Sequence, residues 1–176
     1  MTSPDGDAPP ETVWQGRWIV VKREGRWEYV ARARGIKAAV IVAIDDGDVL
    51  LVEQYRVPLG RRCLELPAGL VGDEEADDTI ARAAARELAE ETGYSADRIE
   101  QLGFFHSSPG MVSEGFTLIR AHGLSRVGTG GGTEHEDIVV HRVPLAEVPA
   151  FVAAKRAEGV AIDVKLLLLL ADSLLG

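Results

Sequence analysis

Residues 72–94 read GDEEADDTIARAAARELAEETGY, and this stretch decides how the rest of the chain is interpreted. If its second half is a helix, Glu87, Glu90 and Glu91 stand at i, i+3 and i+4 and share one face. Like charges that close repel one another by roughly 0.2–0.5 kcal/mol per pair on an exposed helix. Gathered oxygen ligands are typical of a site for a divalent cation such as Mg2+. The alternative is a solvated acidic face, and the surrounding residues decide between the two.

The same stretch resembles the signature of the Nudix hydrolases, G-x5-E-x7-R-E-U-x-E-E-x-G-U, in which U is a bulky apolar residue. Gly72 opens the signature and residues 86–94, RELAEETGY, close it. Two positions depart from the pattern, since Asp78 stands where the family has Glu and Tyr94 only loosely matches the last apolar position. A second registration, from an earlier glycine, places Glu75 at the acidic position but needs three extra residues before the arginine. The catalytic half is the same in both.

Segments outside the signature are similar to the ADP-ribose pyrophosphatase branch of this family. They are VEQYR at 52–56, GRRCLELPAG at 60–69 and SSPG at 107–110, with Glu114 following. The resemblance implies an α/β (α+β) fold, the Nudix-type α/β/α sandwich, with a mixed β-sheet and an N-terminal antiparallel strand pair. It also implies hydrolysis of the diphosphate bond of ADP-ribose or a related nucleoside diphosphate sugar. With ADP-ribose the products would be AMP and ribose 5-phosphate.

The resemblance further implies a bound Mg2+, with Mn2+ as a substitute. Its expected ligands are the carboxylates of Glu87, Glu90, Glu91 and Glu136 and the backbone carbonyl of Ala68. Pro67-Ala68-Gly69 is expected to be a tight turn that aims this carbonyl, because glycine tolerates unusual dihedral angles.

Residues 128–137, GTGGGTEHED, are the second expected part of the site. Three consecutive glycines favour a mobile loop that closes over bound substrate. By position in the family pattern, Glu136 is the expected metal ligand and Glu134 the expected catalytic base, with Glu90 left open as an alternative base. The other interpretation is a solvated surface loop, and His135 receives no role.

Other charged residues are candidates for binding or orientation. Arg56 is expected to grip a phosphate or the terminal ribose, because a guanidinium group binds phosphate in a bidentate way. Glu114 either reaches the substrate or is merely exposed, and Arg61 or Arg62 either assists Arg56 or is a solvated charge. Arg86 is expected to orient the carboxylates as part of the catalytic set, since arginine does not give up its proton at ordinary pH.

The N-terminal segment is rich in large aromatic residues, namely Trp14, Trp18, Trp27 and Tyr29. Such residues fill a core or a subunit interface, or stack on a base. Trp27 is kept as a candidate substrate contact. The resemblance implies a homodimer in which residues 12–35 form strands at the dimer interface.

Composition sets outer limits on the function. A chain of 176 residues, 46% hydrophobic, fits one domain, expected over residues 12–176 behind a disordered tail at 1–11. The net charge of −9 argues against a nucleic-acid partner but not against a small nucleotide substrate, because bound cations invert the local field. The single Cys63 allows no internal disulfide, and the apolar run at 166–170 is too short to span a membrane. We therefore expect a soluble cytoplasmic protein with no membrane partner.

Hydrophobic patterning predicts the secondary structure. Strands are expected at 18–22, 27–32, 38–44, 49–55, 64–66, 99–105, 116–121 and 137–143, and helices at 145–158 and 163–175. Asp77 or Asp78 is the expected cap of the acidic helix, and Gly93 ends it. The predicted apolar stripe of this helix consists of Ile80, Ala81, Ala84 and Leu88.

Two alternatives to a nucleoside diphosphate sugar hydrolase stay open. The first is a Nudix hydrolase of another nucleotide, such as a damaged nucleoside triphosphate or a dinucleoside polyphosphate. The second is a non-hydrolytic module that binds a nucleotide metabolite and regulates another process, since one fold hosts several functions. The presence of all three carboxylates at 87, 90 and 91 favours an enzyme.

Overall fold

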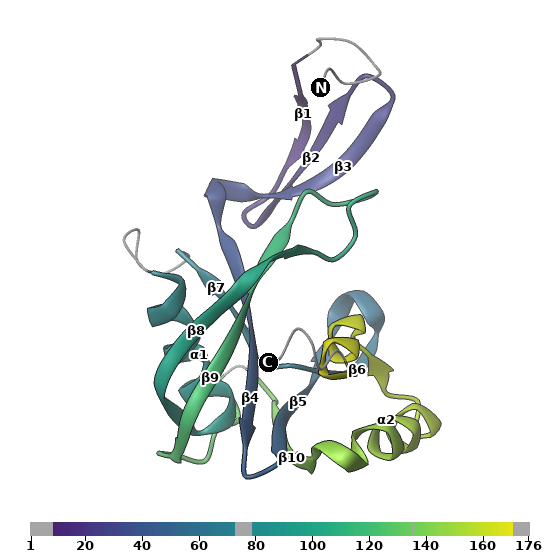
Figure 1. The fold of residues 1–176 in the computed structure, drawn as a ribbon. Coiled ribbons are helices and arrows are strands. Elements are labelled where there is room, and N and C mark those ends of the chain that lie inside the picture. Colours follow the sequence, from purple (N-terminus) through teal and green to yellow (C-terminus); the bar gives the residue numbers. More distant parts are fainter. Residues whose placement is uncertain (1–8, 73–78, 135, 171–176) are drawn as a thin grey trace.

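The computed structural model describes residues 9–72, 79–134 and 136–170, which form two sheets and the helices that cover the larger one (Figure 1). The strands are β1 (Glu11–Gln15), β2 (Ile19–Glu24), β3 (Trp27–Arg32), β4 (Lys37–Asp45), β5 (Asp48–Arg56), β6 (Arg61–Glu65), β7 (Ala68–Val71), β8 (Tyr94–His106), β9 (Gly115–Arg126), β10 (Val139–Pro144) and β11 (Ala161–Ile162). The α-helices are α1 (Ile80–Thr92) and α2 (Val148–Ala157), and the 3-10 helices are η1 (Ala33–Gly35), η2 (Val57–Leu59), η3 (Leu145–Glu147) and η4 (Val164–Leu170).

The larger sheet is mixed, as expected. Its order is β11-β6-β5-β4-β9-β8, with β10 paired to β5 and β7 paired to β4. The β4–β9 and β11–β6 pairs are parallel and the other pairs are antiparallel. Strand β11 is too short to be predicted from the sequence. It is recognised only by its parallel pairing with β6.

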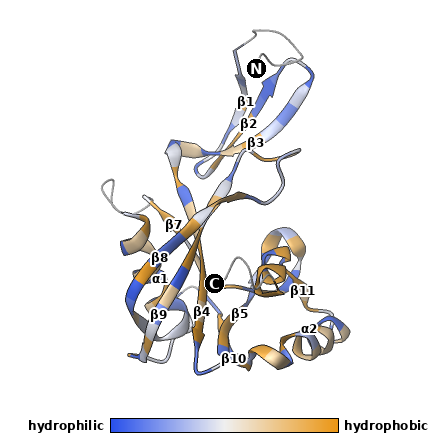
Figure 2. Cartoon of the chain, viewed as in Figure 1, coloured by the Kyte–Doolittle hydropathy of each residue, from blue (hydrophilic) through white to orange (hydrophobic). Residues whose placement is uncertain are grey.

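Strand β4 lies at the centre and is buried on both faces, which explains its continuous apolar sequence. Ala39, Ile41 and Ala43 pack toward α1, together with Leu88 of that helix. The alternate residues of β4, such as Val42, pack in a second core that the C-terminal helical segments close from the other side: Val40 and Val42 with Val148, Phe151, Val152, Leu166 and Leu169. Figure 2 shows the apolar colour concentrated along β4 and β5. The layers are therefore helix, sheet and helix, which confirms the predicted sandwich.

Helix α1 is the predicted acidic helix, but it starts later than expected. Thr79 is its cap, with the Thr79 hydroxyl accepting a hydrogen bond from the Arg82 N–H at 3.2 Å, so the expectation of an aspartate cap is corrected. Asp77 and Asp78 lie outside the described residues. Gly93 ends the helix in the left-handed conformation, as expected (φ 77°). The buried face includes Ala83 in place of the predicted Ala81.

The C-terminal segments differ from two long helices. The first splits into η3 and α2. The second is a 3-10 helix, η4, at whose start Asp163 accepts the Lys165 N–H through Oδ1 (2.7 Å) and the Leu166 N–H through its carbonyl (3.1 Å). Asp163 therefore caps this segment as predicted. The predicted residues beyond 170 lie outside the described part of the chain.

The N-terminal sheet has three antiparallel strands rather than the expected pair, and it projects from the main body (Figure 1). Strand β1 begins at Glu11, the last residue of the expected tail. The alternation of polar and apolar residues in this segment is too weak to predict a strand. Trp14, Trp18 and Trp27 are 54%, 41% and 47% exposed, so they are not core residues of this chain. Val30 of β3 joins the sheet to the body through backbone hydrogen bonds to the loop after β8.

Among the described residues, no helix has the length and apolar character needed to cross a membrane.

Candidate active site

The acidic helix presents two of its three carboxylates to one pocket. Glu87 and Glu91 line a cavity of about 410 Å3, together with residues of β4, β5, β7 and β9. Glu90 is exposed and lies outside this lining, at 3.8 Å from Arg86 Nη1. One turn of helix thus separates the pair that faces the pocket, and the assigned roles of Glu90 stay predictions.

Gly69 lies in close contact with Glu87. This contact, rather than a turn, is the reason that position 69 needs a glycine. The predicted tight turn is instead the first part of strand β7, in which Ala68 pairs with Val40 and Gly69 with Ala39. A Cβ atom on Gly69 would lie 2.0 Å from Cγ of Glu87, so no larger side chain fits without moving that carboxylate. The expectation that Gly69 serves unusual dihedral angles is therefore corrected.

Replacing Gly69 with alanine is expected to lower kcat/KM by about 10-fold to 100-fold, in the range of changes to groups that orient a ligand. The reason is the displacement of Glu87, whose backbone is fixed in α1. Gly128→Ala is the matched control, since its added Cβ would meet nothing closer than 3.9 Å. The measurement is steady-state turnover of both variants. A Gly69→Ala protein as active as Gly128→Ala would show that the position of Glu87 is not critical.

Glu91 is a buried acid of the pocket with a strongly raised pKa. It is 5% exposed, and burial raises its pKa to about 8. The Ala68 N–H donates to Glu91 Oε2 at 3.0 Å and partly opposes this rise, whereas the nearby carboxylates of Glu87 and Glu136 add to it. Glu91 is thus a buried acid among acids, which is the electrostatic setting that a cation relieves.

The loop after β9 contributes Glu136 to the same pocket. Glu136 lines the cavity, and its Oε2 accepts hydrogen bonds from the Thr133 N–H (2.9 Å) and hydroxyl (3.1 Å). The Gly131 N–H donates to the Glu91 carbonyl at 2.9 Å, so this loop is tied to the end of α1. Glu134 is exposed and is not part of the lining, and His135 lies outside the described residues. The predicted base therefore stays a prediction.

Arg56 lines the pocket, its predicted contact with the substrate stays a prediction, and a buried carboxylate holds it in place. Its Nε and Nη2 donate to Glu65 Oε1 and Oε2 at 2.6 and 2.8 Å, a bidentate pair. Hydrogen bonding to Glu65 raises the pKa of Arg56. Glu65 is not among the residues predicted for the site. Its sequence position offers one indication, an acid directly before the apolar Leu66-Pro67 pair, where a core residue would otherwise be expected.

Two further charged residues of the pocket, Glu114 and Lys165, are each paired with a residue of opposite charge. Glu114 lines the cavity, which leaves its substrate contact a prediction, and its Oε1 accepts from Arg32 Nε at 2.5 Å, where β3 ends. Lys165 of η4 also lines the cavity and is paired with Asp163. Lys165 is not among the residues predicted for the site. The only indication in the sequence is that this single cation directly precedes an unbroken run of leucines.

Three candidates lie elsewhere. Trp27 lines a separate depression with Tyr29 and Pro109, on the N-terminal sheet. Neither Arg61 nor Arg62 lines the pocket. The structure therefore does not bring these three residues to the acidic cluster within one chain.

Comparison with known proteins places this site in a family. The model of the NUDIX domain matches residues 34–163, which is more than half of the chain. The chain belongs to the NUDIX family. The matched range holds β4–β11 and α1, and so the whole acidic cluster.

Curated relatives share the domain but extend beyond it. The methanol dehydrogenase activator of Bacillus methanolicus is 36% identical over 67% of this chain and 63% of its own length. The ADP-ribose pyrophosphatase of Bacillus subtilis (strain 168) is 41% identical over 49% of this chain and 45% of its own length. Other relatives are ADP-ribose or GDP-mannose pyrophosphatases. The alignments thus span about half to two thirds of the first relatives.

A solved structure has the same fold over nearly the whole chain. The crystal structure of an ADP compounds hydrolase superposes with a TM-score of 0.70 at 24% identity, covering 94% of this chain and 91% of that one. At this identity the likeness establishes the fold.

Nudix hydrolases need a divalent metal ion, and the donor set of this Nudix domain suits one. Glu87, Glu91 and Glu136 are hard oxygen donors on one pocket, and the pKa of Glu91 is raised mainly by burial and further by the charges of Glu87 and Glu136. No three acidic, histidine or cysteine side chains among the described residues form a preassembled cage. That arrangement still suits Mg2+, which usually combines one or two carboxylates with waters and substrate phosphates.

Arg86 of the Nudix signature contacts the acids rather than the pocket. Its Nη1 donates to Glu87 Oε1 at 3.1 Å and lies 3.8 Å from Glu90 Oε2. Arg86 is therefore in position to orient Glu87, and its role in catalysis stays a prediction. The first acidic position of the signature, Asp78 or Glu75, lies outside the described residues.

Proposed function

We propose that this chain hydrolyses the diphosphate bond of ADP-ribose or a related nucleoside diphosphate sugar with the help of Mg2+. The observation that carries the proposal is the two-sided pocket. Glu87, Glu91 and Glu136 line it together with Arg56, which Glu65 holds by two hydrogen bonds. Such a pocket offers oxygen donors for a cation and a guanidinium group for a phosphate or ribose oxygen. The pyrophosphatase relatives support the substrate class.

A divalent cation held by Glu87, Glu91, Glu136 and the Ala68 carbonyl would neutralise the diphosphate and lower the pKa of a water molecule. Glu134 is the proposed base that accepts the proton of this water, with Glu90 as the alternative. The water oxygen forms a bond to one phosphorus while the bond from that phosphorus to the bridging oxygen breaks. Both phosphates leave as monoesters, which for ADP-ribose are AMP and ribose 5-phosphate.

Arg56 is proposed to bind the substrate without further rearrangement. Its guanidinium is fixed by Glu65 before any substrate arrives, so less side-chain freedom is lost on binding. Glu114, fixed by Arg32, can accept a hydrogen bond from a sugar hydroxyl in the same pocket.

The protein is proposed to act as a homodimer. The N-terminal sheet projects from the body and exposes Trp14, Trp18 and Trp27, which is typical of a surface that a partner covers (Figure 1). In such a dimer, Trp27 could contact the substrate of the partner subunit. Light scattering that gives the mass of a single chain would contradict this proposal.

We also propose a cytoplasmic location. The single cysteine, Cys63, is buried and unpaired with another cysteine, as expected in a reducing compartment. Localisation of the tagged full-length protein would test this.

The test of the proposed function is turnover of a nucleotide panel with Mg2+, with the products separated by chromatography. The panel contains ADP-ribose, ADP-glucose, GDP-mannose, NADH, diadenosine polyphosphates and 8-oxo-dGTP. We expect metal-dependent cleavage of ADP-ribose or another nucleotide sugar, with the activity lost in Glu91→Gln. Preferred cleavage of 8-oxo-dGTP or a dinucleoside polyphosphate would replace the substrate class. Tight binding of one ligand without cleavage would instead favour a regulatory module.

A further inference from the structure

Arg62, in β6, lies outside the pocket but joins two segments that meet beside it. On one side its Nε donates to Glu53 Oε1 at 2.8 Å and its Nη2 donates to the Glu53 carbonyl at 2.7 Å. On the other side Nη1 donates to Asp137 Oδ2 at 2.8 Å and Nη2 donates to the Asp137 carbonyl at 3.0 Å. Asp137 directly follows Glu136, which lines the pocket. One guanidinium group therefore connects the loop at residues 128–137 to strand β5.

The carbonyl contact makes this more than a surface ion pair. The Asp137 side chain is 86% exposed, and an ion pair at such a position contributes only about 0–1 kcal/mol. The bond to the Asp137 carbonyl acts on the backbone instead, and the planar guanidinium presents both donors in a fixed geometry. Arg62 thus fixes the path of the main chain where the loop leaves the pocket.

The other end of the loop is fixed independently. The Gly131 N–H donates to the Glu91 carbonyl at 2.9 Å and the Gly132 N–H donates to the Glu90 carbonyl at 3.0 Å, both at the end of α1. Residues 133–136 lie between this anchor and the one made by Arg62. The location of Glu136 relative to α1 therefore depends on both anchors.

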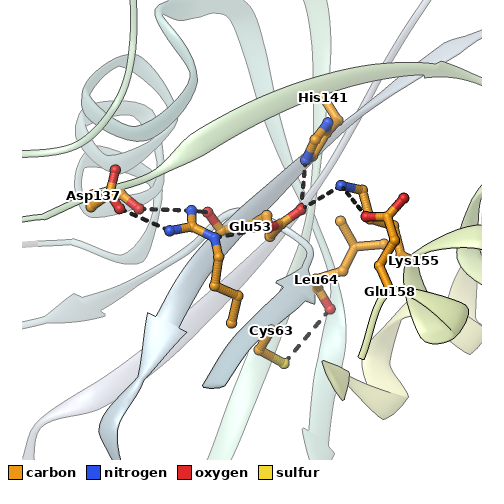
Figure 3. A network of polar contacts seen from close by, with 8 residues as sticks. Glu53, Cys63, Leu64, Asp137, His141, Lys155 and Glu158 are labelled. Carbon is orange, nitrogen blue, oxygen red and sulfur yellow. Dashed lines mark hydrogen bonds and ion pairs between the residues drawn. The ribbon is translucent and has the colours of Figure 1, made fainter. Parts of the chain in front are cut away.

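Glu53 holds Arg62 from a buried position. Burial alone would raise the pKa of Glu53, but hydrogen bonds from Lys155, Arg62 and His141 outweigh it and keep the pKa below its ordinary value. Glu53 Oε2 lies 2.9 Å from Lys155 Nζ and 3.1 Å from His141 Nε2. Figure 3 shows Glu53 between Asp137 on one side and His141 and Lys155 on the other. Side chains of three elements thus support the contact made by Arg62: Glu53 of β5, His141 of β10 and Lys155 of α2. None of these side chains lines the pocket.

We propose that Arg62 is a positioning residue that holds the main chain at Asp137, so that Glu136 is kept beside Glu87 and Glu91 and the affinity for the divalent cation is high. This inference rests on the proposed role of Glu136 as a metal ligand. Arg62 makes no contact with the substrate itself in this arrangement. Its effect is expected in metal binding and only secondarily in substrate binding.

The experiment compares wild type, Arg62→Met, Arg62→Lys and Arg61→Met. Binding of Mn2+ alone is measured by calorimetry, and ADP-ribose turnover is measured over a range of Mg2+ concentrations. In Arg62→Met we expect Mn2+ affinity to fall and the half-saturating Mg2+ concentration to rise, each by about 10-fold to 100-fold. The KM for ADP-ribose at saturating Mg2+ should change far less. Arg62→Lys should recover part of the loss, since it keeps the charge but not the fork.

Arg61→Met is the matched control, because Arg61 is the neighbouring arginine, is exposed and lies outside the pocket. It should behave as wild type. Asp137→Asn keeps the carbonyl contact and should weaken Mn2+ binding less, by about threefold to tenfold. Combining it with Arg62→Met should add nothing, since the side-chain contact that Asp137→Asn alters is already lost with Arg62.

Wild-type Mn2+ affinity in a folded Arg62→Met protein would overturn the inference, and so would an equal loss in Arg61→Met. If Arg62→Met fails to fold, wild-type Mn2+ affinity in Arg62→Lys, which lacks the guanidinium fork, overturns it. The calorimetry needs no substrate, so it still decides the role of Arg62 if the wild-type protein cleaves nothing in the panel. Failure of the proposed function is then seen in turnover alone.

Discussion

Replacing Glu91 with glutamine is expected to abolish hydrolysis and, in metal-free protein near neutral pH, to raise the melting temperature. Activity should fall by about 1000-fold or more, because the variant loses the charge of a buried carboxylate that is proposed to bind the cation. Stability should rise because the wild-type carboxyl is 5% exposed and has carboxylates of Glu87 and Glu136 nearby. The catalytic requirement and the folding requirement thus act in opposite directions at one residue.

The pH dependence follows from the direction of the shift. Burial raises the folded-state pKa of Glu91 to about 8, above the value of 4.5 that an unfolded chain would have. The folded protein therefore binds more protons between these values, and Glu91 lowers stability progressively as the pH rises from about 4.5 to about 8. A full shift corresponds to about 1.4 kcal/mol per pKa unit, so the total is a few kcal/mol at most. The Glu91→Gln protein should lack this pH dependence.

The measurement is thermal unfolding in a chelator across this pH range, for wild type, Glu91→Gln and Glu90→Gln. Glu90 is the comparison for stability because it undergoes the same chemical change at an exposed position of the same helix. Only Glu91→Gln should gain stability toward high pH. Equal melting temperatures of Glu91→Gln and wild type at every pH would show that the pKa of Glu91 is not raised in solution.

Much of the fold could be predicted because local patterns and the buried faces agree. The apolar run of β4 reflects burial on both sides, and Gly93 ends α1 because its left-handed conformation suits glycine. The start of α1 was predicted wrongly because three polar residues compete to cap it, and a hydroxyl at Thr79 does so. Strand β1 pairs with its neighbour β2 through an irregular register, and β11 has only two residues that pair with the distant β6, so neither shows a clear local pattern.

The residues of the site could be predicted where they lie together on one helix face or in one loop. Glu87 and Glu91 share a face of α1, so their spacing alone predicted that they lie together. Glu65 and Lys165 reach the same pocket from β6 and η4, and only the folded sheet brings them there. Gly69 was singled out for the wrong reason, since its close approach to Glu87 depends on the packing of α1 against β7. Local spacing therefore predicted two acids of the pocket but not the residues that reach it from other elements.

Replacing Arg56, the partner of Glu65, is expected to change both the stability of the protein and its KM. These two changes have different causes and can be measured separately. Arg56→Met is expected to lower the free energy of unfolding by about 1–3 kcal/mol, because it leaves Glu65 buried without its bidentate partner. The estimate lies below that for a fully buried pair, since the Arg56 side chain is 41% exposed. The same change should raise the KM for ADP-ribose by about 10-fold or more, because the phosphate or ribose loses a guanidinium contact.

The double variant Arg56→Met/Glu65→Gln separates these two effects. Removing the buried charge of Glu65 should restore most of the lost stability, because no uncompensated carboxylate then remains at that position. KM should remain as high as in Arg56→Met, because the double variant still lacks the guanidinium group. Denaturant unfolding gives the first quantity and steady-state kinetics gives the second. If KM recovers together with stability, Arg56 serves only the fold, and the substrate is bound by other cations of the pocket such as Lys165.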